Sequence, residues 1–327
     1  MMRSELNSGN PQRSVVVRAG LPDSEYQIKV LENSRHIMTV TKKIIKAAAK
    51  PIIQYRAHQQ LGLLSRAGDS AAELVAAAIG EAMEDDLSPD ERQLSNDIET
   101  LRSRLAESTE QLPYVDFGAG DAGDERSAEQ MSTGVTRQMT VGQACRASKG
   151  YFWSLLLFKL VRKFQPMTCI ELGTCLGISA AYQAGAQKLN GKGRLVTLEG
   201  APALAELAQS NLESFCLDNA EVITGRFADT LHSSLRSYNP IDYAFVDGHH
   251  DELATLGYFE QLLPFIHGNA VVVFDDISWS AGMRRAWQQI EGDENVAISV
   301  DLRTVGICIV RTGHNAQKYR FDIRMPV

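Results

Sequence analysis

The chain has 327 residues, 44% of them hydrophobic and 22% charged, which is the composition of an ordinary globular protein with a large core. Its formal net charge is −7, so there is no basic field to attract a nucleic acid or an anionic membrane, and neither is expected as a partner. No apolar run reaches the roughly 18 residues of a membrane span, and no secretory signal core is visible, so we expect a cytoplasmic protein.

The five cysteines agree with that location. They are an odd number and lack the C-x-x-C spacing of redox and metal motifs. Most of them lie in apolar runs, where cysteine usually packs as a small hydrophobic side chain. The pattern therefore favours a reducing compartment.

The amino-terminal part of the chain divides into two predicted regions. Residues 1–25 mix Ser, Asn, Gly, Pro and Arg without periodicity, which is typical of a flexible tail. Residues 26–110 follow a helical hydrophobic pattern, and we expect a helical region that serves as a lid or as the surface of a homodimer. Within it, Ser88 and Glu91 around Pro89 form a capping box, which marks the start of a helix.

The composition then changes twice. Residues 111–139 are rich in Gly, Asp and Ala and are predicted to form an acidic glycine-rich loop. In residues 140–327, nearly continuous apolar runs alternate with amphipathic helical segments, which indicates a doubly wound α/β domain with a mostly parallel sheet. The predicted strands are 168–172, 194–199, 220–224, 242–247, 270–276, 296–302 and 306–312.

Glycines and acids dominate the predicted strand ends, where such sheets bind their ligands. The loop after the first strand has Gly173 and Gly177 instead of the G-x-G-x-x-G spacing that cradles a dinucleotide phosphate. Glu199 ends the second strand, where an acidic side chain in these folds takes both hydroxyls of a ribose. A ribose-bearing, phosphate-free and partly cationic ligand fits this rim, and S-adenosylmethionine matches that description.

These residues carry a family resemblance. The run from Phe164 to Thr312, with its motifs ELGTCLGIS, VTLEG, FVDGHHDELATLGYFEQLLP and VFDDISWSAGMRRAW, resembles the class I S-adenosylmethionine-dependent methyltransferases and, among them, a bacterial group. The resemblance implies a Rossmann-like sheet of seven strands with the last one antiparallel. It also implies that the methionine part of the cofactor lies over Gly173 to Gly177, and that the adenine lies beside Arg226.

Two further contacts are less direct. Glu171 is expected either to orient the glycine loop or to meet the methionine amine. In the resembling group a D-x-G-A-G segment precedes the sheet, and a similar cover here would bring Tyr114, Asp116 and Asp121 near the sulfonium, to which an aromatic ring is attracted. The predicted cofactor-binding residues are Glu171, Gly173, Thr174, Gly177, Glu199, Gly200, Arg226, Phe227, Asp247, Tyr114 and Asp116.

Three aspartates at neighbouring strand ends are candidates for a metal site. Asp247, Asp275 and Asp276 would offer the oxygen ligands that Mg²⁺ prefers. The arrangement is similar to the metal site of catechol-type O-methyltransferases, although Asp276 stands where an asparagine is usual. In the alternative interpretation, Asp275 or Asp276 caps a helix and Asp247 contacts substrate or amine.

His249 and His250 follow Asp247, and the three are the candidates for catalysis. A histidine with a pKa near neutrality is suited to take a proton from an acceptor hydroxyl or amine. The expected function is therefore S-adenosylmethionine-dependent O- or N-methylation of a small molecule. Two alternatives stay open: intramolecular cyclisation of the cofactor with release of methylthioadenosine, and cofactor binding without catalysis. A serine hydrolase is not expected, because the G-x-S-x-G elbow is missing.

Overall fold

The computed structural model describes residues 50–117, 126–312 and 318–326. The chain divides into Met1–Pro51 and Ile52–Val327, and the second unit contains the sheets, the numbered helices and the pocket. The predicted tail and the first part of the predicted helical region lie outside the described residues.

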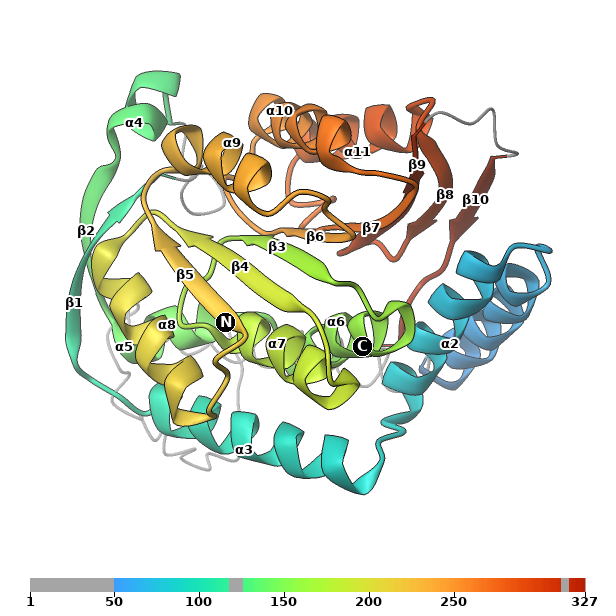
Figure 1. Cartoon of the computed structure of the whole chain (residues 1–327), viewed down its shortest axis with the longest axis horizontal. Helices are drawn as coiled ribbons and strands as arrows, with labels where there is room; N and C mark the ends of the chain where they lie inside the picture. Colours follow the sequence, from blue (N-terminus) through green and yellow to red (C-terminus); the bar gives the residue numbers. More distant parts are fainter. Residues whose placement is uncertain (1–49, 118–125, 313–317, 327) are drawn as a thin grey trace, which may run out of the picture. The chain divides into compact units, whose positions relative to one another are not determined.

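An eight-stranded sheet forms the centre of this unit, in the order β10-β8-β9-β7-β6-β3-β4-β5 (Figure 1). Neighbouring strands are parallel, except that β9 is antiparallel to both β7 and β8. This confirms the predicted doubly wound α/β fold. The strands are β3 (Thr168–Leu172), β4 (Arg194–Glu199), β5 (Ala220–Thr224), β6 (Tyr243–Val246), β7 (Asn269–Phe274), β8 (Val296–Asp301), β9 (Gly306–Arg311) and β10 (Tyr319–Asp322).

The sheet has one strand more than the seven that the resemblance implied. The added strand is β10, which runs parallel to β8 at the edge of the sheet. Its Tyr319 and Phe321 are half-buried, whereas Arg320 and Asp322 are exposed. A four-residue alternation is too short to stand out in the sequence, and the pairing with β8 makes it a strand.

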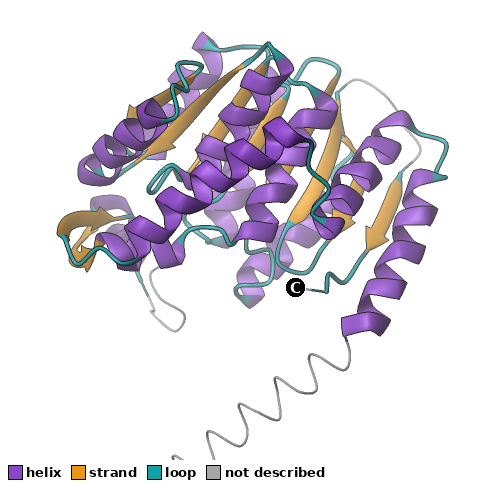
Figure 2. Ribbon diagram, turned by 90° about the horizontal axis from the view of Figure 1, so that it is seen from below, coloured by secondary structure: helices purple, strands orange, loops and turns teal. Residues whose placement is uncertain are grey.

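Helices cover both faces of the sheet, and Figure 2 shows those of one face in front of the strands. One face carries α5 (Val141–Ala147), α6 (Tyr151–Phe164), α7 (Ile178–Asn190) and α8 (Pro202–Ser214), and the other carries α9 (Phe227–Ser237), α10 (Glu252–Leu262), η1 (Leu263–Phe265) and α11 (Ala281–Gly292). Alternate strand residues serve the two layers: Tyr243 and Phe245 pack in the first core, and Ala244 and Val246 in the second.

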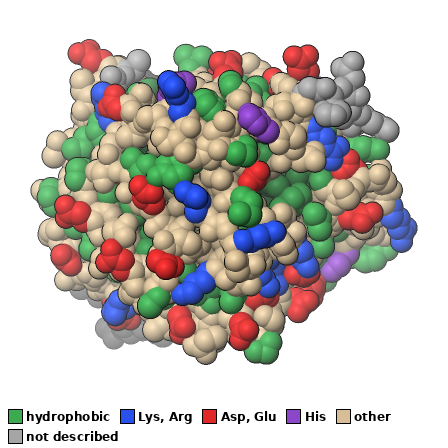
Figure 3. Space-filling model, viewed as in Figure 1, with side chains coloured by type: hydrophobic (Ala, Val, Ile, Leu, Met, Phe, Trp, Pro, Cys, Tyr) green, Lys and Arg blue, Asp and Glu red, His purple; other side chains and the backbone are tan. Residues whose placement is uncertain are grey.

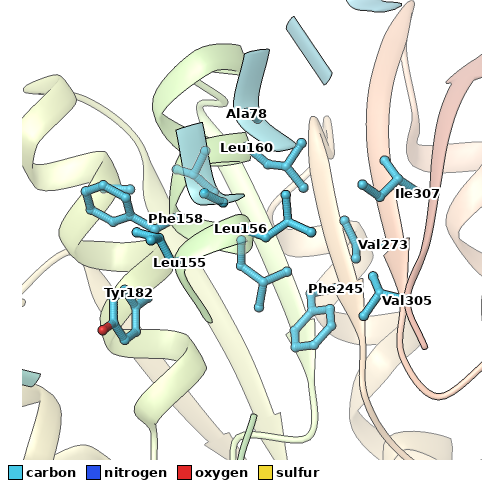
Figure 4. Packing of buried hydrophobic residues seen from close by; sticks show 14 of the residues in the cluster. Ala78, Leu155, Leu156, Phe158, Leu160, Tyr182, Phe245, Val273, Val305 and Ile307 are labelled. Carbon is cyan, nitrogen blue, oxygen red and sulfur yellow. The ribbon is translucent and has the colours of Figure 1, made fainter. Parts of the chain in front are cut away.

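A further helical layer lies outside α6 and α7. It consists of α2 (Ser70–Glu84) and α3 (Pro89–Ala106); α2 packs on α6, and α3 packs on α5 and α7. A further helix spans residues 50–65. Figure 4 shows Ala78 of α2 beside Leu160 of α6. The predicted capping box is present, since the Ser88 hydroxyl accepts from the Glu91 amide and the Glu91 carboxylate accepts from the Ser88 amide.

The predicted glycine-rich loop is partly wrong. Its ends form an antiparallel pair, β1 (Gln111–Asp116) and β2 (Val135–Thr140), with the short helix α4 (Ala128–Thr133) before β2. The Gly and Asp residues that dominated the composition lie mainly within 118–125, outside the described residues. The flanking segments are richer in β-branched and aromatic residues, which favour strands.

Acidic and basic side chains are interspersed on the face shown in Figure 3. No helix within the described ranges is both long and apolar enough to cross a membrane.

Candidate active site

A pocket opens at the carboxyl edge of the sheet, between the strand-end loops and β1. The loops after β3, β4, β5 and β6 line it from the sheet side, β1 and Phe117 from another side, and the segment after α5 from a third. The predicted residues that line it are Tyr114, Asp116, Gly173, Thr174, Glu199, Gly200, Arg226, Phe227, Asp247, His249 and His250.

The loop after β3 requires its glycines for packing. Gly173 has φ 101°, and a Cβ there would lie 2.0 Å from the carbonyl oxygen of Asp247. Gly177 has φ 78° at the start of α7, and a Cβ there would lie 3.3 Å from Ala208 of α8. Gly173 thus permits a close approach of two loops in the pocket, whereas Gly177 is not among the lining residues.

Glu199 ties two of these loops together. Its Oε2 accepts a hydrogen bond from the Cys175 amide and its Oε1 one from the Ala201 amide, both at 2.8 Å. Burial raises the pKa of this carboxyl, and the two amides oppose the shift. Each carboxylate oxygen keeps a second lone pair, so the side chain can still accept from two hydroxyls in the pocket.

Glu171 does not line the pocket. It is fully buried, and its carboxyl accepts from Gln183 Nε2 at 2.7 Å and from Thr197 Oγ1 at 2.6 Å. The Thr197 hydroxyl lies 2.6 Å from that of Thr174 in the pocket loop. Burial raises the pKa of Glu171 to about 7. Of the two expected roles, this placement supports loop orientation rather than direct contact with the methionine amine.

The β1–β2 pair brings its own side chains to the pocket. Asp116 accepts from Arg126 Nη2 at 2.7 Å and lies 3.5 Å from the Tyr114 hydroxyl. Phe117 packs so closely over Gly200 that a Cβ on that glycine would lie 2.9 Å from the ring. Phe117, just after β1, therefore stands against the loop after β4, as a cover would require. Asp121 lies outside the described residues.

The adenine region predicted from the resemblance lies after β5. Arg226 forms a bidentate pair with Asp229, with contacts of 2.6 and 3.0 Å. Phe227 makes edge-to-face contacts with the rings of His249 and Tyr258, at centroid distances of 5.8 and 5.7 Å. Phe227 thus offers an apolar wall next to the histidine loop.

The two histidines differ in their surroundings. His249 Nδ1 is hydrogen-bonded to the Tyr258 hydroxyl, and burial lowers its pKa, which favours the neutral ring. His250 Nε2 lies 3.7 Å from Asp247 Oδ1. Burial raises the pKa of Asp247, and the charges of Lys149 and His250 oppose the shift. The pair of His250 and Asp247 is therefore the better placed of the two candidates for proton removal.

Two of the three predicted metal ligands, Asp275 and Asp276, face a lysine. The Lys149 ammonium contacts the carboxylate of Asp275 and lies 3.8 Å from that of Asp276. Its charge also opposes the rise in the pKa of Asp247 that burial causes. No group of three or more His, Cys, Asp or Glu side chains suited to a metal occurs among the residues that the structure describes. The structure therefore does not fit the predicted Mg²⁺ site, because an ammonium faces the oxygens that would bind it.

Strained backbone conformations also occur on the loops at this edge of the sheet. Cys175, His249, His250 and Asp276 have φ values of 51°, 65°, 48° and 49°, the left-handed region that residues other than glycine seldom adopt. Such conformations are maintained by the surrounding structure and are common at functional sites. They fix the directions in which these side chains point.

Lys149 and Phe117 are two of the pocket residues that were not predicted from the sequence. Lys149 stands in S-K-G just before the apolar helix α6, where a lysine is usually solvated, and Phe117 follows β1. Neither belongs to a strand-end motif. Only the packing of these segments across the sheet edge brings them to the pocket.

Part of this chain is similar to known methyltransferases. Residues 170–277 match the family model described as a methyltransferase domain. Over 141 residues the chain is 30% identical to a catechol O-methyltransferase of Mycobacterium tuberculosis. The aligned residues make up 43% of this chain and 60% of the relative. Over 120 residues it is 31% identical to a catechol O-methyltransferase of Niastella koreensis. These aligned residues make up 36% of this chain and 52% of the relative.

Among solved structures, an O-methyltransferase from Bacillus cereus in complex with SAH is 26% identical, with a TM-score of 0.44 and coverage of 50% of this chain and 83% of that chain. The chain spans about half to three fifths of the length of the two curated relatives. The segment that matches the methyltransferase-domain model, residues 170–277, contains the loops after β3 to β7. Lys149 and the β1–β2 pair lie outside it.

Proposed function

We propose that this protein is an S-adenosylmethionine-dependent methyltransferase that acts on a hydroxyl group of a small molecule. The observation that carries the proposal is one pocket in which Glu199 and the Gly173 loop lie beside the pair of Asp247 and His250. The methyltransferase-domain match supports the reaction class. The names of the two curated relatives favour oxygen as the methylated atom.

The residues present fit the cofactor. Glu199 would accept from the ribose hydroxyls, and the loop from Gly173 to Cys175 would lie along the methionine part. The rings of Phe227 and Tyr114 would stand beside the adenine and the sulfonium, where aromatic faces gain from stacking and from the cation. Gly200, overlaid by Phe117, leaves no space for a side chain at the end of β4.

The bound cofactor would supply an activated methyl group for in-line transfer. The protein's part is then to orient the acceptor oxygen and to remove its proton. We assign proton removal to His250, with the Asp247 carboxylate stabilising the imidazolium that results. His249 holds the loop through its bond to Tyr258.

Product analysis tests this function. The protein would be incubated with S-adenosylmethionine and a panel of catechols and other phenols, and the nucleosides separated by chromatography. We expect S-adenosylhomocysteine to accumulate only when an acceptor is present. Rapid methylthioadenosine release without an acceptor would instead establish the cyclase reaction, and neither product in the presence of measured cofactor binding would indicate a binding protein.

A further inference from the structure

The carboxylates of Asp275 and Asp276 face a single ammonium, and the charge of that ammonium also acts on the neighbouring strand-end acid Asp247. This acid cluster would carry three negative charges if all its members were ionised, and such a concentration needs a compensating cation. The Lys149 ammonium is in contact with Asp275, lies 3.8 Å from Asp276 and acts on Asp247 through its charge. The cation that the cluster requires is thus part of the chain.

Lys149 is fixed from both sides. Its carbonyl accepts hydrogen bonds from Arg102 Nη1 of α3 at 2.6 Å and from the Ser154 hydroxyl of α6 at 3.2 Å. Its side chain is only 12% exposed. These contacts place the ammonium at the pocket wall before any ligand binds, and Lys149 is one of the lining residues.

Asp275 depends on this lysine. Its side chain is fully buried, and apart from the contact with Lys149 neither of its oxygens has a hydrogen-bond partner in the part of the chain that the structure describes. A buried carboxylate without a counter-charge is strongly destabilised, so the ion pair with Lys149 is what keeps Asp275 acceptable at this position. A divalent ion at Asp275 would have to displace the ammonium.

We propose that Lys149 takes the place of a divalent metal in this active site, and that its ammonium holds the acceptor oxygen while His250 removes the proton. The inference deepens the proposed function by assigning the residue that binds the acceptor hydroxyl. An ammonium has three N–H donors. Two of them can face Asp275 and Asp276, which leaves one for an oxygen in the pocket, where the positive charge also stabilises the developing alkoxide or phenoxide.

Metal binding tests the replacement without any assay of methyl transfer. Mn²⁺ would be titrated into the purified protein and followed by the loss of the free-ion EPR signal. We expect no saturable binding to the wild-type protein. Lys149→Ala should bind Mn²⁺ saturably, with a dissociation constant at least about tenfold below the highest concentration at which the wild-type protein binds none, since removal of the ammonium frees the acid cluster. Lys149→Met, which keeps the apolar stem, serves if the alanine variant does not fold.

Two controls isolate the charge at this position. Lys149→Arg keeps a cation beside the acids and should bind no more Mn²⁺ than the wild type. Lys163→Ala removes another lysine–carboxylate pair, with Glu81, that lies outside the pocket, and it should likewise gain nothing. Stoichiometric Mn²⁺ binding by the wild-type protein, or no gain in a folded Lys149→Ala or Lys149→Met variant, would overturn the proposal.

Turnover supplies the second measurement. Methyl transfer by the wild-type protein should be unchanged by EDTA or added Mg²⁺, and Lys149→Ala should raise KM for the acceptor about tenfold or more, whereas Lys163→Ala should not. Activity that EDTA abolishes and Mg²⁺ restores would refute the lysine's role. If no acceptor is methylated at all, the function fails while the Mn²⁺ titration still decides the metal question.

Discussion

The carboxyl edge of the sheet has two halves that neutralise acidic side chains in different ways. In the cofactor half, which comprises the loops after β3 and β4, Glu199 is held by backbone amides of both loops. In the transfer half, which comprises the loops after β6 and β7, Asp275 depends on the side chain of Lys149 from a distant segment. Backbone amides are present whatever the sequence, whereas a lysine is a single residue that a mutation can remove.

We expect this difference to separate binding from chemistry. The acid of the cofactor half is held by amides of its own loops, and we expect changes there to alter affinity for the cofactor. The transfer half is assembled from side chains that meet across the sheet edge, and changes there should alter turnover. The following substitutions test this division.

The largest effect is expected in the transfer half. His250→Asn should lower kcat about 10²- to 10⁴-fold, because the proton acceptor is lost, while asparagine tolerates the left-handed backbone at this position. Stopped assays of S-adenosylhomocysteine give kcat, and calorimetry should find the affinity for that product unchanged. His267→Asn, at an exposed site outside the pocket, is the control. A comparable loss of product affinity in His250→Asn would contradict the division.

The second-largest effect concerns Glu171, the buried acid under the loop after β3. Because burial raises the pKa of Glu171 from an ordinary value of 4.5 to about 7, the folded state should bind more protons between these values, and stability should fall as the pH rises from 4.5 towards 7. Glu171→Gln should remove this fall, worth about 3 kcal/mol at pH 8. Urea unfolding of both proteins at pH 5 and pH 8 measures it. An unchanged pH slope in the variant would show that the carboxyl stays ionised.

A slightly smaller effect is expected for the ribose contact. Glu199→Ala should weaken S-adenosylhomocysteine binding by about 2–3 kcal/mol, because charge-assisted hydrogen bonds to two hydroxyls are lost. Isothermal calorimetry measures this without knowledge of the acceptor, and circular dichroism checks that the variant is folded. Full affinity in a folded variant would remove Glu199 from the site.

The smallest effect is expected in the outer helical layer. Ser88→Ala removes the cap of α3 and should cost about 1 kcal/mol of unfolding free energy. Neither product affinity nor turnover should change, since α3 contributes no residue to the pocket within the described chain. Ser103→Ala, on the exposed side of the same helix, is the matched control and should be near neutral. Altered turnover in Ser88→Ala would connect this layer to the site and support the predicted lid.

Most of the fold was predictable because its signals are local. The predicted bounds of β3, β4 and β5 agree with the structure, since each strand is a short run bounded by turn or helix signals. Glu199 could be selected for a similar reason, because its position at a strand end follows from the pattern alone. β1, β2 and β10 were missed, as each becomes a strand through pairing with a partner rather than through a strong pattern of its own.

The site was predictable only in part because side-chain direction and long-range packing decide the rest. Glu171 was selected for its nearness to the glycine break, yet its side chain points into the core. Asp275 and Asp276 do meet at one place, beside Lys149, but the described residues contain no three-carboxylate group suited to a metal. Their partner, Lys149, comes from the segment between α5 and α6, and no spacing rule connects it to the strand ends.

The close approach at Gly173 has one more consequence. The backbone of Gly173 lies against the carbonyl of Asp247, so main-chain contact alone sets the distance between the two halves of the sheet edge. The side chains of Tyr114 and Phe117, on β1 and just after it, line the pocket but take no part in that contact. We therefore expect that substitutions at Tyr114 and Phe117 can change which acceptor is bound. The distance between the methyl donor and the proton acceptor should stay the same in such variants.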